Sequence, residues 1–283
     1  MAGKNMTGSI IRFTPARVKC VALAALVSLS HCAASAAEAP ASISGPWRII
    51  ANSTDTQATI SFYTKVNDPS YVGRVVRFDN HAVSGDAALN IDCQQPAYLQ
   101  QSPMTLNEAI VKTSGERRFP PKIPVAEDFG LNGQGMQKIT PIVLQCQQGH
   151  LGPDGESIGN WVALLSADKL LMYGNDNSYF VLKRVTADEK ITPRFSCNAK
   201  LSATEQAICG DNELAAWERS VTDAYTIQLQ QQQEIDPADK ATLAGMKAAQ
   251  RDWLKKRNQC QTDAACLTKS MQERTFELVS KIQ

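Results

Sequence analysis

The hydrophobic residues follow two different periods along the chain, and the change falls near residue 194. From residue 47 to residue 184 they come in short alternating or continuous runs that end at turn-rich segments such as "NDPS". Runs of this kind predict β-strands, and eight of them favour an antiparallel barrel or sandwich. The predicted strands are "WRIIA" (47–51), "ATISFYT" (58–64), "YVGRVVRF" (71–78), "AALNIDC" (87–93), "TPIVLQC" (140–146), "WVALLS" (161–166), "KLLMYG" (169–174) and "YFVLKR" (179–184).

Between residues 100 and 139 the chain has no clear period, and residues 118–135 predict a long loop. Beyond residue 194 the apolar positions recur every three or four residues, which is the period of an amphipathic α-helix. "SATEQAIC" (202–209) predicts a short helix in which Ser202 is the N-cap and Glu205 completes a capping box.

Three longer helices are predicted to follow, the first from about Asn212. We expect Asp236 to cap the second of them and Thr262 to cap the third. Amphipathic helices with short connections predict an antiparallel bundle. Their inward faces are expected to carry Leu214, Trp217, Val221, Ala224 and Tyr225, then Leu243, Met246, Gln250, Trp253 and Arg257, then Leu267, Met271, Arg274 and Leu278.

The first 36 residues have the pattern of a cleaved secretory signal. Four basic residues and no acid accompany the short apolar core "CVALAALVSLS" (20–30), and small residues follow with an A-x-A spacing that ends at Ala36. A membrane span needs about twenty apolar residues, and this run is shorter. We therefore expect cleavage near Ala36 and release into a periplasm or the medium, with lipid attachment at Cys32 as the alternative.

Charge and cysteine content narrow the class of the exported chain. Without the signal, 25 basic side chains stand against 28 acidic ones, and no long run of one sign occurs. This balance of −3 argues against nucleic acid as a partner. Six cysteines remain, an even number, which in an exported chain indicates disulfides rather than a zinc site. They are Cys93, Cys146, Cys197, Cys209, Cys260 and Cys266.

The spacing of these cysteines suggests pairings. Cys93 and Cys146 each end a predicted strand and can bond to each other. Cys260 and Cys266 are six positions apart, so one continuous helix would keep their sulfur atoms too far apart to bond. A corner between two helices would let them pair, and Cys209 could likewise clip the short helix to Cys197. We favour these local pairs, although crossed pairings remain possible, because four cysteines allow three connectivities.

The predicted fold class is therefore α+β, with an N-terminal antiparallel β-barrel or sandwich followed by a disulfide-stapled, antiparallel three-helix bundle. The expected boundaries are a signal peptide at 1–36, a β-rich domain at 38–184, a linker at 185–193 and a helical domain at 194–283. The linker is polar and ends in proline, and each half has an even number of cysteines. We therefore expect the two halves to be separable.

The C-terminal third resembles the LprI-like family of secreted lysozyme-inhibitor domains. The resemblance covers about residues 195–281 and includes the cysteine spacing and the run Q-R-x-W-L-x-x-R. The residues that carry it are Cys197, Thr204, Glu205, Ile208, Cys209, Leu214, Tyr225, Gln250, Arg251, Trp253, Leu254, Arg257, Cys260, Cys266, Leu267, Arg274 and Leu278. Trp217 stands where an aspartate is expected, and the glutamine run 228–233 is particular to this chain. The N-terminal half is weakly similar to lipocalin-like barrels through Gly45-x-Trp47.

Four polar residues of the helical region are predicted to form a structural network. Gln250, Arg257 and Arg274 fall on the stripes that should face the bundle interior, and Glu205 lies on the short helix nearby. Buried charges are retained when they are paired. We therefore predict that Glu205 contacts Arg257 or Arg274. In the alternative interpretation, one of these arginines is exposed and inhibitory.

No motif in the sequence points to catalysis, and no cofactor or metal site is predicted. There is neither a G-x-S-x-G elbow nor an H-E-x-x-H helix. The resemblance instead implies a non-enzymatic binding protein that inhibits lysozyme or another peptidoglycan hydrolase, which includes an immunity protein against a secreted wall-degrading toxin. The alternative is a periplasmic carrier or an envelope structural protein. A hollow apolar barrel would favour the carrier, and a filled barrel would favour the inhibitor.

Overall fold

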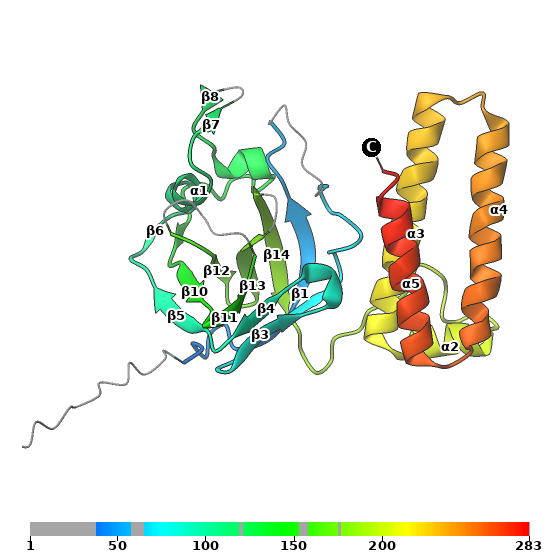
Figure 1. Cartoon of the computed structure of the whole chain (residues 1–283), viewed down its shortest axis with the longest axis horizontal. Coiled ribbons are helices and arrows are strands. Elements are labelled where there is room, and N and C mark those ends of the chain that lie inside the picture. The colour runs from blue at the N-terminus through cyan, green and yellow to red at the C-terminus, as the bar shows by residue number, and fades with distance from the viewer. Residues whose placement is uncertain (1–37, 58–64, 119–120, 153–157, 175–176, 283) are drawn as a thin grey trace, which may run out of the picture. The chain divides into compact units, whose positions relative to one another are not determined.

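The computed structural model describes residues 38–57, 65–118, 121–152, 158–174 and 177–282. The predicted signal peptide, Cys32 and the predicted strand at 58–64 lie outside the described residues. Figure 1 shows strands in the N-terminal part of the described chain and helices in the C-terminal part, which confirms the predicted fold class.

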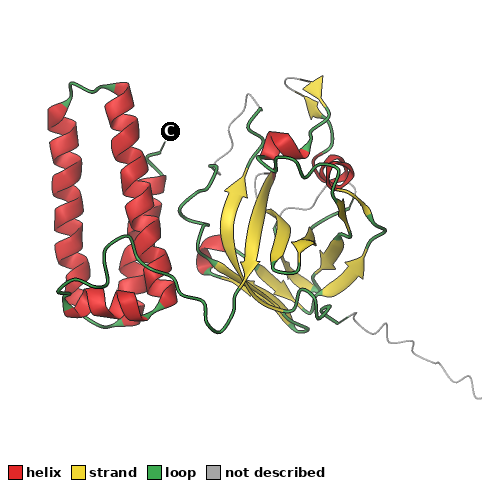
Figure 2. Ribbon diagram, turned by 180° about the vertical axis from the view of Figure 1, so that it is seen from behind, coloured by secondary structure: helices red, strands yellow, loops and turns green. Residues whose placement is uncertain are grey.

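The strands form an antiparallel sheet that curls into a half-barrel (Figure 2). Ten strands of the described chain take the order β11-β4-β3-β2-β1-β14-β13-β12-β10-β5. Their bounds are β1 Gly45–Ser53, β2 Val75–Phe78, β3 Ala82–Gly85, β4 Asp92–Gln94, β5 Ala97–Gln100, β10 Ile142–Gln145, β11 Gln148–His150, β12 Trp161–Ser166, β13 Lys169–Gly174 and β14 Ser178–Arg184. The predicted strands at 47–51, 161–166, 169–174 and 179–184 match β1, β12, β13 and β14. The strands predicted at 71–78, 87–93 and 140–146 are longer than the observed β2, β4 and β10.

The two ends of this strand order meet at a bend. β4 runs on into β5 and β10 runs on into β11, and both pairs keep one register, from Asp92 opposite His150 to Gln100 opposite Ile142. The predicted disulfide Cys93–Cys146 crosses this bend with its Cα atoms 5.1 Å apart. It closes a loop of 53 residues, which in the chain-entropy model stabilises the fold by about 4 kcal/mol.

The region predicted to lack regular structure contains a helix. α1 (Leu106–Ser114) begins at Thr105, whose side chain forms a capping box with Glu108. The predicted loop at 118–135 includes a short 3-10 helix, η2 (Ala126–Phe129), and a second one, η1 (Ala87–Leu89), precedes β4. Two small pairs of strands complete this part, β6 (Met104–Thr105) with β9 (Lys138–Ile139) and β7 (Arg117–Arg118) with β8 (Pro121–Lys122).

The curled sheet is filled with apolar side chains on both faces. One cluster contains residues from strands along the whole sheet, including Trp47, Phe78, Leu170 and Phe180. A second cluster packs α1 and η2 against the other face. It includes Leu106, Ile110, Phe129, Trp161 and Tyr179. Consecutive residues of β13 point to opposite faces, so the continuous apolar run "LLMY" reflects a strand that is buried on both sides.

The helices lie close to their predicted places. They are α2 (Ala203–Gly210), α3 (Asn212–Ile235), α4 (Lys240–Arg257) and α5 (Ala264–Val279), with a 3-10 turn, η4 (Asn258–Cys260), before α5. Ser202 and Glu205 form the predicted capping box of α2. Two predicted caps are wrong, because Asp239 rather than Asp236 caps α4 and Asp263 rather than Thr262 caps α5. Both segments offer successive capping side chains, and the one used depends on where the turn ends.

The three long helices are packed unequally. α3 and α5 share an apolar core of Leu214, Trp217, Val221, Ala224, Leu267, Met271 and Leu278. In α4 only Gln250 and Arg257 are buried, and the predicted inward residues Leu243 and Met246 are half-exposed. Figures 1 and 2 both show α4 standing apart from α3 and α5 over most of its length. α4 is therefore held by contacts near its ends and by a few polar side chains.

Candidate functional site

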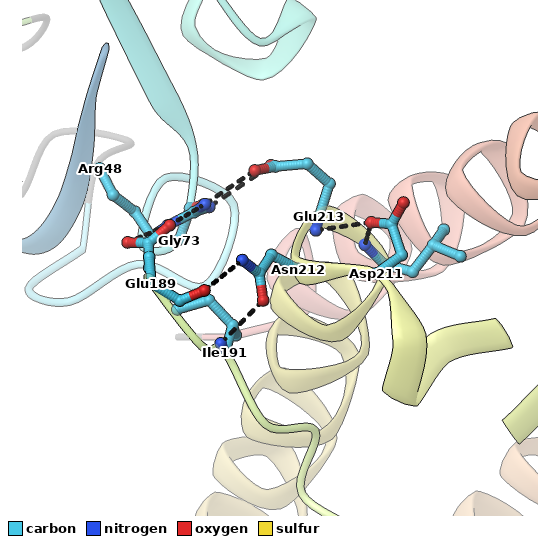
Figure 3. A network of polar contacts seen from close by, with 8 residues as sticks. Arg48, Gly73, Glu189, Ile191, Asp211, Asn212 and Glu213 are labelled. Carbon is cyan, nitrogen blue, oxygen red and sulfur yellow. Dashed lines mark hydrogen bonds and ion pairs between the residues drawn. The ribbon is translucent and has the colours of Figure 1, made fainter. Parts of the chain in front are cut away.

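A buried arginine links the sheet to the helical region. Arg48 of β1 is 4% exposed, and its Nη2 atom lies 2.7 Å from Glu189 and 2.8 Å from Glu213 (Figure 3). Its Nη1 atom also donates to the carbonyl oxygen of Gly73 at 2.7 Å. Burial alone would lower the pKa of Arg48, but the hydrogen bonds to the two carboxylates outweigh burial and raise it. The arginine therefore stays charged and ties three segments together.

The segment 185–193 is joined to the start of α3 by the Asn212 side chain. This amide donates to the carbonyl oxygen of Glu189 at 2.8 Å and accepts from the backbone N–H of Ile191 at 2.9 Å. Asp211 caps the same helix by accepting from the backbone N–H groups of Glu213 and Leu214 (Figure 3). The C-terminal half of the predicted linker is thus hydrogen-bonded to the start of α3.

A second arginine of the sheet region packs on a helix. Arg74 is fully buried, and its guanidinium carbon lies 3.3 Å from the ring centroid of Trp217. Its Nη2 atom donates to the Ser220 hydroxyl at 3.1 Å, whereas Nε and Nη1 have no hydrogen-bond partner within the described residues. Burial lowers the pKa of Arg74 to about 10. Sequence patterns do not reveal such a residue, because its environment comes from segments about 140 positions apart.

Beside this junction lies a cavity of about 520 Å³. Its lining includes Arg48, Lys190, Arg194, Arg219 and Asp223. Arg194 and Asp223 form an ion pair at 2.7 Å across the lining. The same lining contains apolar residues, among them Ile49, Val72 and Ile191, so the cavity is a mixed polar and apolar surface between β1 and α3.

Two members of the predicted polar network meet between α4 and α5. Arg274 is 7% exposed, and its Nε and Nη2 atoms donate to Gln250 Oε1 at 3.2 and 2.9 Å. Its Nη1 atom lies 2.6 Å from a carboxylate oxygen of Glu277. The amide of Gln250 therefore anchors the middle of α4 to α5 in a region where few apolar side chains connect them.

The other two members, Glu205 and Arg257, line the same recess and interact through their charges, without a hydrogen bond between them. Glu205 accepts hydrogen bonds from the backbone and hydroxyl of Ser202, and these bonds lower its pKa. Arg257 donates to the Asn258 side chain at 3.1 and 2.8 Å. In the described chain no hydrogen bond joins Glu205 to Arg257 or Arg274, and the capping box holds the Glu205 carboxylate through Oε2.

Arg257 is nevertheless held in an acidic environment. Burial lowers its pKa, while the charges of Glu218 and Glu205 act in the opposite direction. Glu218 is itself buried and accepts from the backbone N–H of Arg194 at 2.6 Å and from the Thr222 hydroxyl at 2.9 Å. The interaction with Arg257 is therefore one of charge across a short distance rather than a direct ion pair.

Two recesses separate α4 from the other long helices. One, of about 300 Å³, is lined by Phe195, Glu205, Glu218, Val221, Thr222, Tyr225, Gln250, Trp253, Leu254 and Arg257. The other, of about 250 Å³, is lined by Tyr225, Gln228, Gln231, Gln232, Ile235, Met246, Ala249, Arg274, Glu277, Leu278 and Lys281. Arg257 and Arg274 both lie over the Trp253 ring, at 5.5 and 6.0 Å from its centroid. These recesses are mixed polar and apolar surfaces.

The four C-terminal cysteines pair locally, as predicted. Cys197 bonds to Cys209 and Cys260 bonds to Cys266, with Cα atoms 5.9 and 5.6 Å apart. The first bond ties the chain before α2 to the end of that helix, and the second closes the corner between α4 and α5. Within the described residues, no group of three or more His, Cys, Asp or Glu side chains is arranged to hold a metal ion.

The corner at 258–266 is an exposed and tightly fixed element. All of its residues except Cys260 are exposed. Gln261 has φ 51° and ψ −107°, which is a conformation that side-chain-bearing residues rarely adopt. Its backbone N–H donates to the Asn258 carbonyl at 3.2 Å, and Thr204 of α2 donates to the same carbonyl at 3.4 Å.

Comparison with known protein families gives a match within the helical part. Residues 197–278 match the family model for the lysozyme inhibitor LprI. The matched segment contains all four C-terminal cysteines and the residues of the predicted polar network. No significant match was found among curated proteins or among solved structures. In the described part of the chain, the helices are too short or too polar to cross a bilayer.

Proposed function

We propose that this protein is an exported binding protein that inhibits lysozyme or another cell-wall hydrolase. The observation that carries the proposal is the match of residues 197–278 to the lysozyme inhibitor LprI. The three disulfides fit a compartment outside the cytoplasm, where thiols are oxidised. Protection of the producing cell against a secreted wall-degrading toxin is one form that this activity can take.

The sheet region supports an inhibitor rather than a carrier. Its inner face is occupied by the apolar cluster that includes Trp47, Phe78 and Phe180, all at most 4% exposed. A lipocalin-like carrier needs free apolar volume in that position. The cavity of about 520 Å³ beside Arg48 has a mixed polar and apolar lining that includes residues of α3 and of the segment 190–194, so it is not the interior of the curled sheet.

We also propose that the helical region from residue 194 onward contains the surface that binds the hydrolase, because the family match falls within it. The sheet region then supports that surface. Arg48 and Arg74 contact Glu213, Trp217 and Ser220 on one side of α3, away from the recesses that face α4. An isolated fragment that starts near Thr192 would expose the Trp217 face that Arg74 covers, so its binding has to be compared with that of the full chain.

The test is inhibition of wall lysis by the mature chain, residues 37–283. The chain is titrated against a c-type lysozyme and a set of bacterial muramidases, and the loss of turbidity of a cell-wall suspension is followed. In parallel, the immobilised chain is used to retain these enzymes from solution. We expect saturable inhibition of at least one muramidase with a matching dissociation constant. A folded, disulfide-bonded chain that neither retains nor inhibits any of the enzymes would contradict the proposal.

A further inference from the structure

The corner between α4 and α5 holds a glutamine in a backbone conformation suited to glycine. At φ 51° and ψ −107°, a Cβ atom crowds the neighbouring backbone, and glycine would adopt these angles at lower cost. The Gln261 side chain is exposed and makes no hydrogen bond within the described residues. The side chain therefore does not offset this cost through contacts inside the molecule.

The corner is rigid because several bonds fix it. The Cys260–Cys266 disulfide closes it, and the backbone N–H of Asp263 donates to the Cys260 carbonyl at 3.0 Å. The Asp263 carboxylate accepts from the backbone N–H of Cys266 at 3.1 Å and so starts α5. A loop that is fixed before binding loses little conformational entropy when it enters a partner.

The exposed side chains at the tip are polar and uncharged, whereas the flanks are basic. Gln259, Gln261 and Thr262 are exposed. Between residues 255 and 269 there are four basic residues and one acid. That acid, Asp263, is occupied as the N-cap of α5. Arg257 is buried and Lys255 pairs with Asp252 at 3.0 Å, so Lys256 and Lys269 are the exposed basic side chains that have no ion pair within the described residues. The corner is thus locally positive on a chain whose mature form has a net charge of −3.

This chemistry fits a cleft that is lined by carboxylates and shaped to bind sugars. Enzymes that hydrolyse glycosidic bonds use a pair of Asp or Glu residues in such a cleft. Amide and hydroxyl side chains can make the hydrogen bonds that a sugar's amide and hydroxyl groups make, and they place no negative charge against the carboxylates. Basic flanks add electrostatic complementarity.

We propose that the corner 258–266 enters the catalytic cleft of a glycan-cleaving wall hydrolase, with Gln261 at its tip. This inference rests on the proposed inhibitory function and names the surface and the partner class. Wall amidases and peptidases, whose clefts are not built around a pair of glycosidase carboxylates, are expected to be inhibited far less.

The experiment introduces a negative or a positive charge at the tip of the corner in the full mature chain. Gln261→Glu is compared with Gln261→Lys, and Gln230→Glu and Gln230→Lys are the matched controls on an exposed position of α3. At low ionic strength, Gln261→Glu should raise the inhibition constant for a muramidase by about tenfold or more, because it opposes like charges. Gln261→Lys should leave the constant unchanged or lower it. Both control variants should stay within about twofold of the unmodified chain.

A third variant, Gln261→Gly, separates the role of the side chain from that of the backbone. Glycine suits the corner, so the melting temperature should be equal or higher while inhibition weakens. If the unmodified chain inhibits but all three Gln261 variants inhibit equally well, the corner is not the binding surface and the proposed function stands. If the unmodified chain inhibits no glycan hydrolase, both proposals are overturned. If Gln261→Glu and Gln261→Lys weakened inhibition equally, the inference that the corner binds a cleft lined by carboxylates would be overturned.

Discussion

The sheet region and the helical region of this protein are stabilised in different ways. The sheet has apolar clusters on both faces, and Trp47, Phe78 and Trp161 are completely buried there. The helical region has one smaller cluster, mostly between α3 and α5, together with two disulfides. Small helical regions that bury little apolar surface commonly depend on such staples.

This difference affects what each region can present to a partner. The sheet is packed on both faces, so few of its side chains are available to contact a partner. In contrast, α4 is attached through polar contacts such as Gln250 with Arg274 and through the disulfide corner. The helical region therefore has exposed and fixed elements that do not serve its own core. The comparison predicts that substitutions in the sheet affect stability most, and that those near α4 affect stability less and binding more.

The largest effect is expected from the sheet core. Trp161→Ala removes a fully buried ring and the hydrogen bond from its indole N–H to Thr113 Oγ1 at 2.5 Å. The free energy of unfolding should fall by about 3–5 kcal/mol, measured by urea denaturation. Leu99→Ala, at a side chain that is 37% exposed, serves as the control and should have a much smaller effect. A loss below about 1 kcal/mol for Trp161→Ala would contradict the importance of this core.

The next effect concerns the disulfides of the helical region. Replacing Cys197 and Cys209, or Cys260 and Cys266, with serine opens loops of 12 and 6 residues. Each change should lower the free energy of unfolding by about 2–3 kcal/mol in the chain-entropy model. Mild reduction should therefore melt the helices before the sheet, as followed by circular dichroism at a helical and a β wavelength during thermal denaturation. If the β signal were lost before the helical signal, the helical region would not be the part that depends more on its disulfides.

A smaller effect is expected at Arg257. Arg257→Ala removes the bonds to Asn258 and leaves a gap beside Trp253, so it should cost about 1–3 kcal/mol and lower the melting temperature. Arg257→Met keeps most of the volume and removes a desolvated charge, so its stability should lie within about 1 kcal/mol of the unmodified chain. If Arg257→Ala abolished inhibition while leaving the melting temperature intact, Arg257 would be a binding residue rather than a structural one.

The smallest effect is expected at the cap of α2. Hydrogen bonds from Ser202 lower the pKa of Glu205, so the stability that this pair contributes is present above the pKa of the unfolded glutamate, about 4.3, and is lost as pH falls through the lower pKa of the folded state. Ser202→Ala should cost about 1 kcal/mol at neutral pH and reduce the acid sensitivity of the helical signal. An unchanged acid titration of helicity in this variant would show that the capping box does not control α2.

Patterns of neighbouring residues predicted many of the strands, helices and disulfides, but they did not predict every element. The strands at 161–166 and 169–174 agree with β12 and β13, and the local cysteine pairs are correct. α1 was missed although Thr105 and Glu108 form the same kind of capping box that identified α2. Its apolar residues face a sheet that is assembled from distant segments, and no neighbouring helix pattern supports them.

The amino-acid sequence alone determined the two periods of hydrophobic residues and the disulfide corner, because these depend on residues close together in the chain. The tertiary structure decided that Arg74 lies on Trp217, that Arg48 joins Glu189 and Glu213, and that Glu205 caps its own helix instead of pairing with Arg257. The partner of a buried charge is chosen by which distant groups reach it after folding. A pattern along the chain carries no information about that distance.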